Sequence, residues 1–347
     1  PEILGGSARF ASELNDALSK HACVTVITRR AKDLYSGSDS KFRGYSVFKF
    51  SLGVLRELLV GNYSDYQFVV AHHYLLGLFS LLASKNARRI YFFHGPVGDE
   101  ETSRGGSKIL ASIKRFVEQF ILKQQDEIYC LSEYMKTRVP KSQQSKVVVL
   151  GPVNSLVDRI EGQKEKINKF TKEPRTPIQL LCVRRLTPRT GVLELVNLMS
   201  DLVEFVELKV VGKGELLTLI TNTKPDNVKI FSDISDSDLE KLYRDSDLTI
   251  LPTRNLEGFG LVIIESLIRG TPVLASSQAG GGKDFLESFS SEFIYCLDAN
   301  AEEFIRAVKS SIATYSNKTL QDDIDRTLKS YSMRNFVIRL IGDFSWK

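Results

Sequence analysis

The sequence predicts an α/β protein with two doubly wound, Rossmann-like domains. At 347 residues the chain is longer than one hydrophobic core usually serves. Short apolar, β-branched runs alternate with helical periodicity in two separate series, as expected for two parallel sheets with helices on their faces. Between the series, residues 158–177 are rich in Lys, Glu, Gln and Pro and poor in periodicity, so we expect the domain boundary just before or within this stretch.

The first series predicts an N-terminal domain over residues 1–154. Helical spacing of apolar residues over 9–20 and 108–123 separates its strands. The expected buried strands are 24–28, 68–71, 90–93, 127–131 and 147–150.

The second series predicts a C-terminal domain over residues 155–330. Ligands of such open sheets bind beyond the carboxyl ends of the strands, so functional residues are expected in the loops that follow strands. The expected strands are 178–183, 208–211, 228–231, 248–251 and 273–275.

Composition narrows the class of protein. A hydrophobic content of 42% and a charged content of 26% are typical of a soluble globular protein. No apolar run approaches the ~20 residues of a membrane span and no signal peptide is visible, so we expect a cytoplasmic protein. The net charge of +5 is compatible with anionic substrates or an anionic membrane surface, and we expect no nucleic-acid partner. Cys23, Cys130, Cys182 and Cys296 lie in or beside β-type runs without Cys-x-x-Cys spacing and are expected to be buried thiols.

Two carboxylates eight positions apart are the most informative local feature. Glu257 and Glu265 follow the predicted strand 248–251, with Gly258 and Gly260 between them. The glycines let a ligand approach the backbone, and the first turn of the helix that opens near Gly260 favours an anion such as a phosphate. Glu265 would then accept hydrogen bonds from a ribose, while Glu257 would face whatever the phosphate carries. The alternative is that Glu265 is an ordinary first-turn acid favoured by the helix dipole.

The Glu-x7-Glu spacing in the context Glu-Gly-Phe-Gly-Leu, followed by residues 269–275 (Arg-Gly-Thr-Pro-Val-Leu-Ala), resembles the donor-site signature of family 4 retaining glycosyltransferases. The likeness runs from Gly5 to about Met333. It implies the GT-B fold, in which two Rossmann-like domains face a cleft and the last helix, here within 331–347, crosses back to the first domain. The donor-binding residues that it implies in this motif are Gly258, Phe259, Gly260, Leu261 and Glu265.

A glycine pair, Gly5 and Gly6, opens the first predicted helix. Alone it is compatible with a phosphate loop or with a simple tight turn. The resemblance implies that this pair lets the donor phosphate and the acceptor approach the backbone. In the family a hydrophobic strand precedes the pair, so a further strand is expected ahead of Pro1 in the native protein.

His94 ends the predicted strand 90–93, before a sharp Gly-Pro turn. An isolated histidine is usually a structural hydrogen-bonding group, but the resemblance matches His94 to a histidine that lies against the donor sugar. His72 and His73 are neighbours on a strand and point to opposite faces, so we expect rim or core residues and not a metal pair. Ser132 resembles the serine of the family's Val-Ser-Glu element at a strand end.

Residues 184–191 resemble the family's Gly-Arg-Leu-x-Pro-x-Lys-Gly element, whose Arg and Lys hold the diphosphate leaving group. Arg185 matches the arginine, while Thr190 stands at the lysine position. Either Arg189 replaces the missing cation, or the cation has been lost. A solvated turn is the alternative for the whole loop.

Two further loops match the resemblance. Gly212 belongs to a Gly-x-Gly turn before a helix, and Ile234 lies in the loop whose backbone meets the nucleobase, with Ser232 in place of the usual glycine.

Aspartate pairs at 236/238 and 245/247 imitate the Asp-x-Asp metal site of another glycosyltransferase fold. The first is better interpreted as a helix N-cap and the second as a polar turn, so no metal site is expected.

Residues 108–123 carry apolar side chains at helical spacing among Lys and Arg. Such a basic amphipathic helix can lie on an anionic membrane, which suggests peripheral association with the inner face of the membrane. A helix that covers a sheet has the same apolar stripe, and the sequence favours that interpretation.

The sequence therefore predicts a retaining, metal-independent hexosyltransferase of polysaccharide biosynthesis. The donor would be a UDP- or GDP-type nucleotide sugar, a co-substrate, so no cofactor is expected. The acceptor would be a glycan, a lipid-linked or a small molecule. His94 and Glu257 are the expected catalytic residues, with Glu257 as an organiser of the transition state more than a nucleophile. The alternatives are a GT-B epimerase, a phosphorylase whose pyridoxal lysine has no clear place here, and a non-catalytic sugar-nucleotide-binding descendant.

Overall fold

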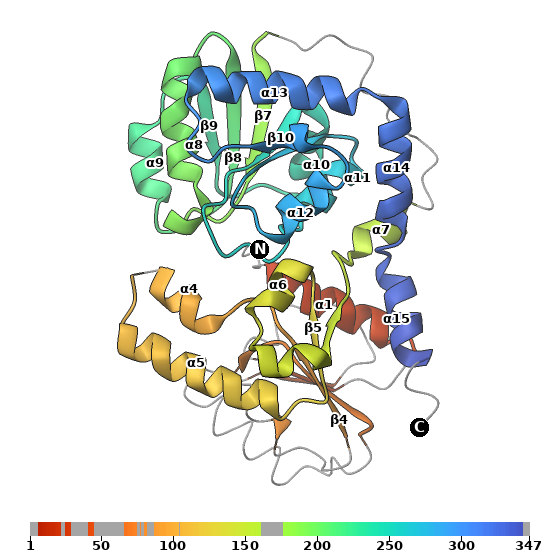
Figure 1. Ribbon diagram of the computed structural model, residues 1–347. Helices are drawn as coiled ribbons and strands as arrows, with labels where there is room; N and C mark the ends of the chain where they lie inside the picture. Colours follow the sequence, from red (N-terminus) through yellow and green to blue (C-terminus); the bar gives the residue numbers. More distant parts are fainter. Residues whose placement is uncertain are drawn as a thin grey trace. The chain divides into compact units, whose positions relative to one another are not determined.

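The computed structural model describes residues 6–21, 25–28, 41–44, 66–74, 77, 80–81, 87–103, 105–160 and 176–342. The chain forms two compact units (Figure 1). Unit 1 comprises Pro1–Ser155 and Met333–Lys347, and unit 2 comprises Leu156–Ser332.

Unit 1 contains a parallel four-stranded sheet in the order β3-β4-β5-β6, and β1 and β2 form a separate parallel pair. Its strands are β1 (Thr25–Thr28), β2 (Lys41–Gly44), β3 (Phe68–Ala71), β4 (Arg88–Phe92), β5 (Glu127–Cys130) and β6 (Val147–Val149). Its helices are α1 (Gly6–Leu18), α4 (Val97–Ser103), α5 (Lys108–Lys123), α6 (Glu133–Arg138), the 3-10 helix η1 (Lys141–Lys146) and α15 (Met333–Gly342). Helix α7 (Ser155–Ile160) lies at the boundary with unit 2.

The sheet of unit 1 is buried on both faces because alternate side chains of its strands point to opposite sides. Ile90 and Phe92 pack with α1 and with the last helix, α15. The last helix belongs to this unit because Met333, Phe336, Val337 and Leu340 recur at helical spacing and bury one face against that cluster. The opposite cluster contains Ala71, Tyr91, Phe93, Ile121, Leu122, Ile128, Cys130, Met135 and Val139.

Unit 2 contains a parallel six-stranded sheet in the order β12-β11-β10-β7-β8-β9. The strand order reverses between β7 and β10, because the chain winds outward from β7 to β9 and then crosses to β10. Such a reversal is where open α/β sheets bind their ligands. The strands are β7 (Ile178–Val183), β8 (Val206–Val211), β9 (Val228–Phe231), β10 (Leu248–Leu251), β11 (Val273–Ser276) and β12 (Ile294–Tyr295).

Helices cover both faces of this sheet (Figure 1). The helices of unit 2 are α8 (Val192–Leu198), α9 (Leu217–Thr223), α10 (Asp236–Asp245), α11 (Val262–Ile268), α12 (Gly281–Glu287), α13 (Ala301–Tyr315) and α14 (Lys318–Lys329), with the 3-10 helices η2 (Pro188–Thr190), η3 (Met199–Leu202) and η4 (Ser291–Phe293). All four residues of β10 and all four of β11 are buried, as expected for strands covered on both faces.

Two features of the sequence were misinterpreted or missed. Cys130 and Cys182 are buried thiols as predicted, but Cys296 is exposed because it follows the two-residue edge strand β12 at the end of its sheet. Cys23 lies outside the described residues. Strands β2 and β12 were not predicted, since Lys41–Gly44 has a polar sequence and β12 is too short to show a pattern.

Candidate functional site

An ion pair lies at the point where the strand order of unit 2 reverses. Arg184 follows β7, Glu257 follows β10, and the Nη2 of Arg184 donates to Oε2 of Glu257. Thr253, also after β10, joins them: its hydroxyl accepts from Arg184 at 3.0 Å and donates to Oε2 of Glu257 at 3.3 Å. The side chains of Arg184 and Glu257 are only 12% and 14% exposed. An ion pair this sheltered is screened little by salt and fixes the direction of the carboxylate.

Three loops that follow β7, β8 and β10 pack backbone against backbone at the same edge of the sheet. A Cβ atom at Gly212 would lie 1.8 Å from the carbonyl oxygen of Arg184, and one at Gly191 would lie 1.8 Å from that of Pro252. No side chain fits these gaps. Glycine at both positions lets the loops converge, and Gly212 thereby supports the loop that carries Arg184.

The segment between β10 and α11 has an unusual backbone. Leu256 adopts a φ of 54°, which is strained for a residue with a side chain, and it directly precedes Glu257. Gly260 adopts a φ of 79°, and its Cα faces the Glu257 side chain, since a Cβ there would lie 3.6 Å from Cγ of Glu257. Phe259 between them is buried and its ring packs on Phe285 at a centroid distance of 5.3 Å. Phe259 therefore anchors the loop and offers a ligand only its backbone.

Glu265 lies in the first turn of α11 and is buried. The hydroxyl of Tyr243 in α10 donates to its Oε2 at 3.0 Å. Arg269 covers the Tyr243 ring, with its guanidinium carbon 4.8 Å from the ring centroid, and donates to the Glu265 carbonyl oxygen at 2.6 Å. The carboxylate of Glu265 is thus held by a packed neighbour, beyond what a helix dipole alone would provide.

The residues of the arginine-rich loop after β7 differ in their exposure and in their hydrogen-bond partners. Arg185 is exposed and no described carboxylate pairs with it, whereas Arg189 donates to the carbonyl oxygen of Leu256 at 3.0 Å. Thr190 is buried, and its hydroxyl donates to the carbonyl oxygens of Arg185 and Thr187 at 2.8 and 2.7 Å. The threonine at the expected lysine position is therefore part of the turn itself.

The remaining predicted residues of unit 2 lie on neighbouring loops. Ile234 is half-buried directly before Ser235, the N-cap of α10. Gly258 is half-buried beside Glu257, and Leu261 is the half-buried N-cap residue of α11.

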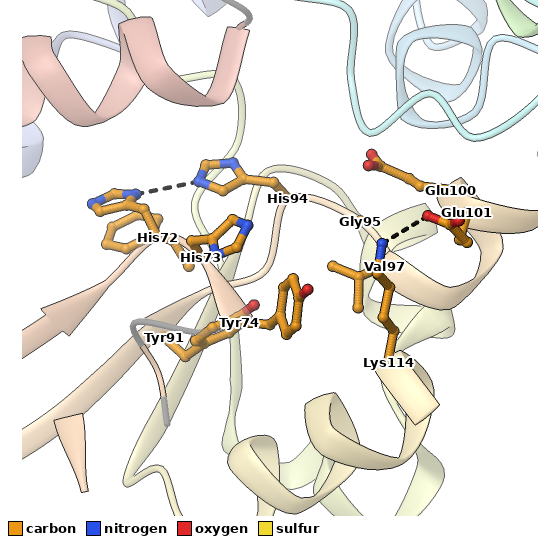
Figure 2. Close-up of a pocket in the computed structure, with 11 residues that line it drawn as sticks. His72, His73, Tyr74, Tyr91, His94, Gly95, Val97, Glu100, Glu101 and Lys114 are labelled. Atoms are coloured by element: carbon orange, nitrogen blue, oxygen red, sulfur yellow. Dashed lines mark hydrogen bonds and ion pairs between the residues drawn. The ribbon is translucent and has the colours of Figure 1, made fainter. Parts of the chain in front are cut away.

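In unit 1, His94 lies just beyond β4 and shares a hydrogen bond with His72: Nε2 of His94 lies 3.2 Å from Nδ1 of His72 (Figure 2). The His72 ring stacks on Phe92 at a centroid distance of 4.5 Å. These histidines line a pocket of about 230 Å³. Its wall also contains His73, Tyr74, Tyr91, Phe92, Gly95, Val97, Glu100, Glu101 and Lys114. Lys114 and Glu101 form an ion pair of 2.7 Å across this wall (Figure 2).

Both paired histidines are neutral near pH 7. Desolvation by burial, reinforced by the nearby His73, lowers the pKa of His94 to about 4. Burial and the neighbouring His94 lower the pKa of His72 well below its usual value. Because one of the two facing ring nitrogens must donate and the other accept, the tautomers of His72 and His94 depend on each other.

The other predicted residues of unit 1 are Gly5, Gly6 and Ser132. Gly5 lies outside the described residues, and Gly6 begins α1. Ser132 is buried and caps α6, since its hydroxyl accepts from the backbone N–H of Met135 at 3.1 Å. Its hydroxyl oxygen therefore has a structural role as the cap of this helix.

The predicted residues thus fall into two sets, one in each unit. Arg184 and Thr253 were not among the predicted site residues, although they contact Glu257, whereas His72, predicted as a rim or core residue, lies in the pocket wall beside His94. Arg184 carried a signal, because two adjacent arginines directly follow a strand, but the resemblance matched only the second, Arg185. His72 carried none, since its partner is 22 positions away in the sequence.

The aspartate pairs have structural roles. The N-cap of α10 is Ser235 and not Asp236: its hydroxyl accepts from the N–H of Asp238 at 3.1 Å. Asp247 accepts from the backbone N–H of Gln179 at 2.8 Å and ties β10 to β7. Among the described residues no group of three or more His, Cys, Asp or Glu side chains is arranged to hold a metal ion.

No helix in the described parts of the chain is long and apolar enough to cross a membrane.

Two family models match the chain: Glycosyltransferase Family 4 over residues 4–152, and Glycosyl transferases group 1 over residues 163–331. An uncharacterised glycosyltransferase of Methanocaldococcus jannaschii is 25% identical over 185 residues, which are 52% of this chain and 48% of that relative. The chain thus matches about half the length of this relative.

Solved structures show the same fold. Sucrose-phosphate synthase from Thermosynechococcus elongatus superposes with a TM-score of 0.74 at 18% identity, over 99% of this chain and 94% of its own. HepE of Anabaena, in complex with UDP-glucose, superposes with a TM-score of 0.70 at 15% identity, over 99% and 97%. The predicted fold class and family are confirmed: the chain belongs to the family 4 glycosyltransferases and has their GT-B fold of two Rossmann-like domains.

Proposed function

We propose that this glycosyltransferase moves a hexosyl group from a UDP-sugar to its acceptor with retention of configuration and without a metal ion. The observation that carries the proposal is the Arg184–Thr253–Glu257 cluster at the strand reversal of unit 2, with an exposed arginine beside it.

Glu257 is the proposed organiser of the transferred sugar. Its Oε2 takes the hydrogen bonds from Arg184 and Thr253, while Oε1 accepts none from a described residue and is available to a sugar hydroxyl. A fixed negative charge beside the sugar stabilises an oxocarbenium-like transition state more than the ground state, which is what lowers the barrier.

Arg185 is the proposed cation for the diphosphate. It is exposed, next in sequence to Arg184, and without a described carboxylate partner, so it can pair with an anion. The backbone N–H groups of Gly260 and Leu261 would share the same phosphates. A guanidinium that pairs with the diphosphate neutralises the charge that develops on the leaving nucleotide, which is the role that a divalent ion has in other transferases.

The nucleoside would be recognised by Glu265, through the ribose, and by the backbone near Ile234, through the base. Tyr243 supports the first role because it orients the Glu265 carboxylate. The complex of HepE with UDP-glucose supports a UDP-type donor for a chain of the same fold. The acceptor class remains the prediction made from the resemblance, and so does the contact of His94 with the sugar.

The test uses the purified full chain with a panel of UDP- and GDP-sugars, with EDTA present throughout. Release of UDP should depend on one UDP-sugar and survive EDTA, and NMR of the product should show the donor's anomeric configuration. Glu257→Gln should abolish turnover while it keeps UDP affinity. Turnover that requires manganese, an inverted product, or a preference for GDP-sugars would each overturn the corresponding part of the proposal.

A binding-only protein is the second candidate, because the buried Thr190 stands where the resembled element has a cation. It predicts UDP binding with no transfer and no donor hydrolysis.

A further inference from the structure

Helix α5 has an apolar face that packs on nothing in the described structure. Its inner side is buried through Ala111, Glu118, Ile121 and Leu122. Its outer side carries Ile109, Ile113, Phe116 and Phe120 at positions i, i+4, i+7 and i+11, which is one continuous stripe about 16 Å long. We call these four residues the outer stripe.

The outer stripe is exposed to an unusual degree. Ile109 is 75% exposed and Phe116 is 72% exposed. Ten large hydrophobic residues are exposed in the described parts of the chain, and five of them, the outer stripe and Leu110, lie within this one helix. Scattered apolar residues are normal on a surface, whereas a cluster of this kind marks an interaction site.

The charges around the outer stripe are positive. The acid of α5, Glu118, is buried on the inner side, so the outer side has no negative charge of its own. Arg115 and Lys114 pair with acids of α4. The exposed Lys108 and Lys123, at the two ends of the helix, have no described carboxylate partner.

The outer stripe continues into a hollow between α5 and η1. The hollow is lined by Phe116, Gln119, Phe120, Lys123, Pro140, Ser142 and Gln143. Lys141, exposed at the start of η1 and also without a described partner, adds a third positive charge on this side.

We propose that the outer stripe of α5 docks on the surface of an anionic lipid bilayer. The apolar side chains would enter the boundary between headgroups and acyl chains, about 5–10 Å deep, while Lys108, Lys123 and Lys141 meet the anionic headgroups. A second copy of the chain fits less well, because two such faces would bring lysines of like charge together. The surface lies within unit 1 and does not depend on the proposed donor chemistry.

The test is co-sedimentation of the chain of residues 1–347, without donor, with vesicles of phosphatidylcholine alone or mixed with phosphatidylglycerol. The chain should bind the anionic vesicles, and binding should weaken as salt rises, since exposed charges are screened. Ile113→Ser/Phe116→Ser should lower the partition coefficient about tenfold or more, because both apolar anchors are lost.

The matched control is Val203→Ser/Phe205→Ser, which removes two hydrophobic residues of unit 2 that are 50% and 48% exposed. It should leave partitioning unchanged. Lys108→Gln/Lys123→Gln should reduce binding to anionic vesicles and flatten its salt dependence. Circular dichroism establishes that all variants are folded.

Equal sedimentation of the wild type and Ile113→Ser/Phe116→Ser would overturn the proposal, and so would equal binding to both kinds of vesicle. The proposal also fails if the wild type does not bind vesicles and is a dimer by size-exclusion chromatography. If Ile113→Ser/Phe116→Ser converts that dimer to a monomer, the outer stripe binds a second copy of the chain. Transferase activity is measured separately, so its absence would leave this result untouched.

Discussion

The candidate residues of the two units differ in charge. In unit 2 the residues are charged and paired: Arg184 holds Glu257 at the edge of the sheet, and Arg185 is exposed beside them. In unit 1, His72 and His94 lie in a pocket wall where burial keeps them neutral. A charged site suits an anionic nucleotide, whereas neutral imidazoles can form hydrogen bonds with uncharged sugar hydroxyls. Residue type and partner together make the difference: Arg184 pairs with a carboxylate, whereas the buried His72 and His94 share a hydrogen bond with each other.

The largest effect is expected from breaking the ion pair of unit 2. Arg184→Ala should lower kcat by about 10²–10³-fold, because it removes a preorganised group that fixes the charge and direction of Glu257. UDP affinity, measured by calorimetry, should change little. Arg184→Lys should recover part of the activity, since a lysine keeps the charge without the forked geometry.

The control for this experiment is Arg254→Ala, which breaks a more exposed pair with Glu194 on the same side of the sheet. It should leave kcat near that of the wild type, because exposed pairs contribute little. If both variants lose activity equally, Arg184 has no special role in positioning Glu257.

The next effect concerns nucleotide recognition in unit 2. Glu265→Ala should weaken UDP binding by about 1–3 kcal/mol, the usual loss when buried polar groups are left unpaired. Tyr243→Phe removes the group that orients Glu265 and should weaken binding by less. Calorimetry on both variants separates the roles, and a UDP affinity unchanged in Glu265→Ala would remove this residue from the site.

A smaller effect, on the stability of the fold, is expected from a substitution of Thr190. Thr190→Lys should lower the free energy of unfolding by about 1–3 kcal/mol in a denaturant titration, because it replaces a buried, hydrogen-bonded hydroxyl. Activity should not rise. A gain of activity in Thr190→Lys would instead mean that this site lacks a cation.

Arg189→Ala should reduce kcat by about tenfold, because Arg189 contacts the strained Leu256, which directly precedes Glu257.

The smallest effect is a pH dependence that arises in unit 1. Burial, mainly, raises the pKa of Glu118 to about 8, with further contributions from Glu100 and Asp99. The folded state therefore binds a proton that the unfolded state releases at lower pH, so this stabilisation is present at acidic pH and is lost as pH rises through about 8. Glu118→Gln keeps an acceptor for the Val97 N–H, and its free energy of unfolding should decline less between about pH 4.5 and 8 than that of the wild type. If the decline in the free energy of unfolding is the same in Glu118→Gln as in the wild type, another titrating group causes it.

Much of this molecule could be predicted from local patterns. Strands β3, β7, β9 and β10 and helix α5 occupy the predicted residues, because buried parallel strands and amphipathic helices are encoded within a few neighbouring positions. The family could be identified for a similar reason: the residues that carry the resemblance lie in one continuous segment around Glu257.

Partners far apart in the sequence required the tertiary structure. Arg184 and Glu257 are 73 positions apart, and only the winding of β7 and β10 brings their loops together. The stripe of α5 shows the same limit: its periodicity predicted a helix that covers a sheet, yet the helix buries Ile121 and Leu122 and leaves Ile113 and Phe116 exposed. Apolar spacing determines that a helix has an apolar face, but which face is buried depends on what the rest of the chain packs against it.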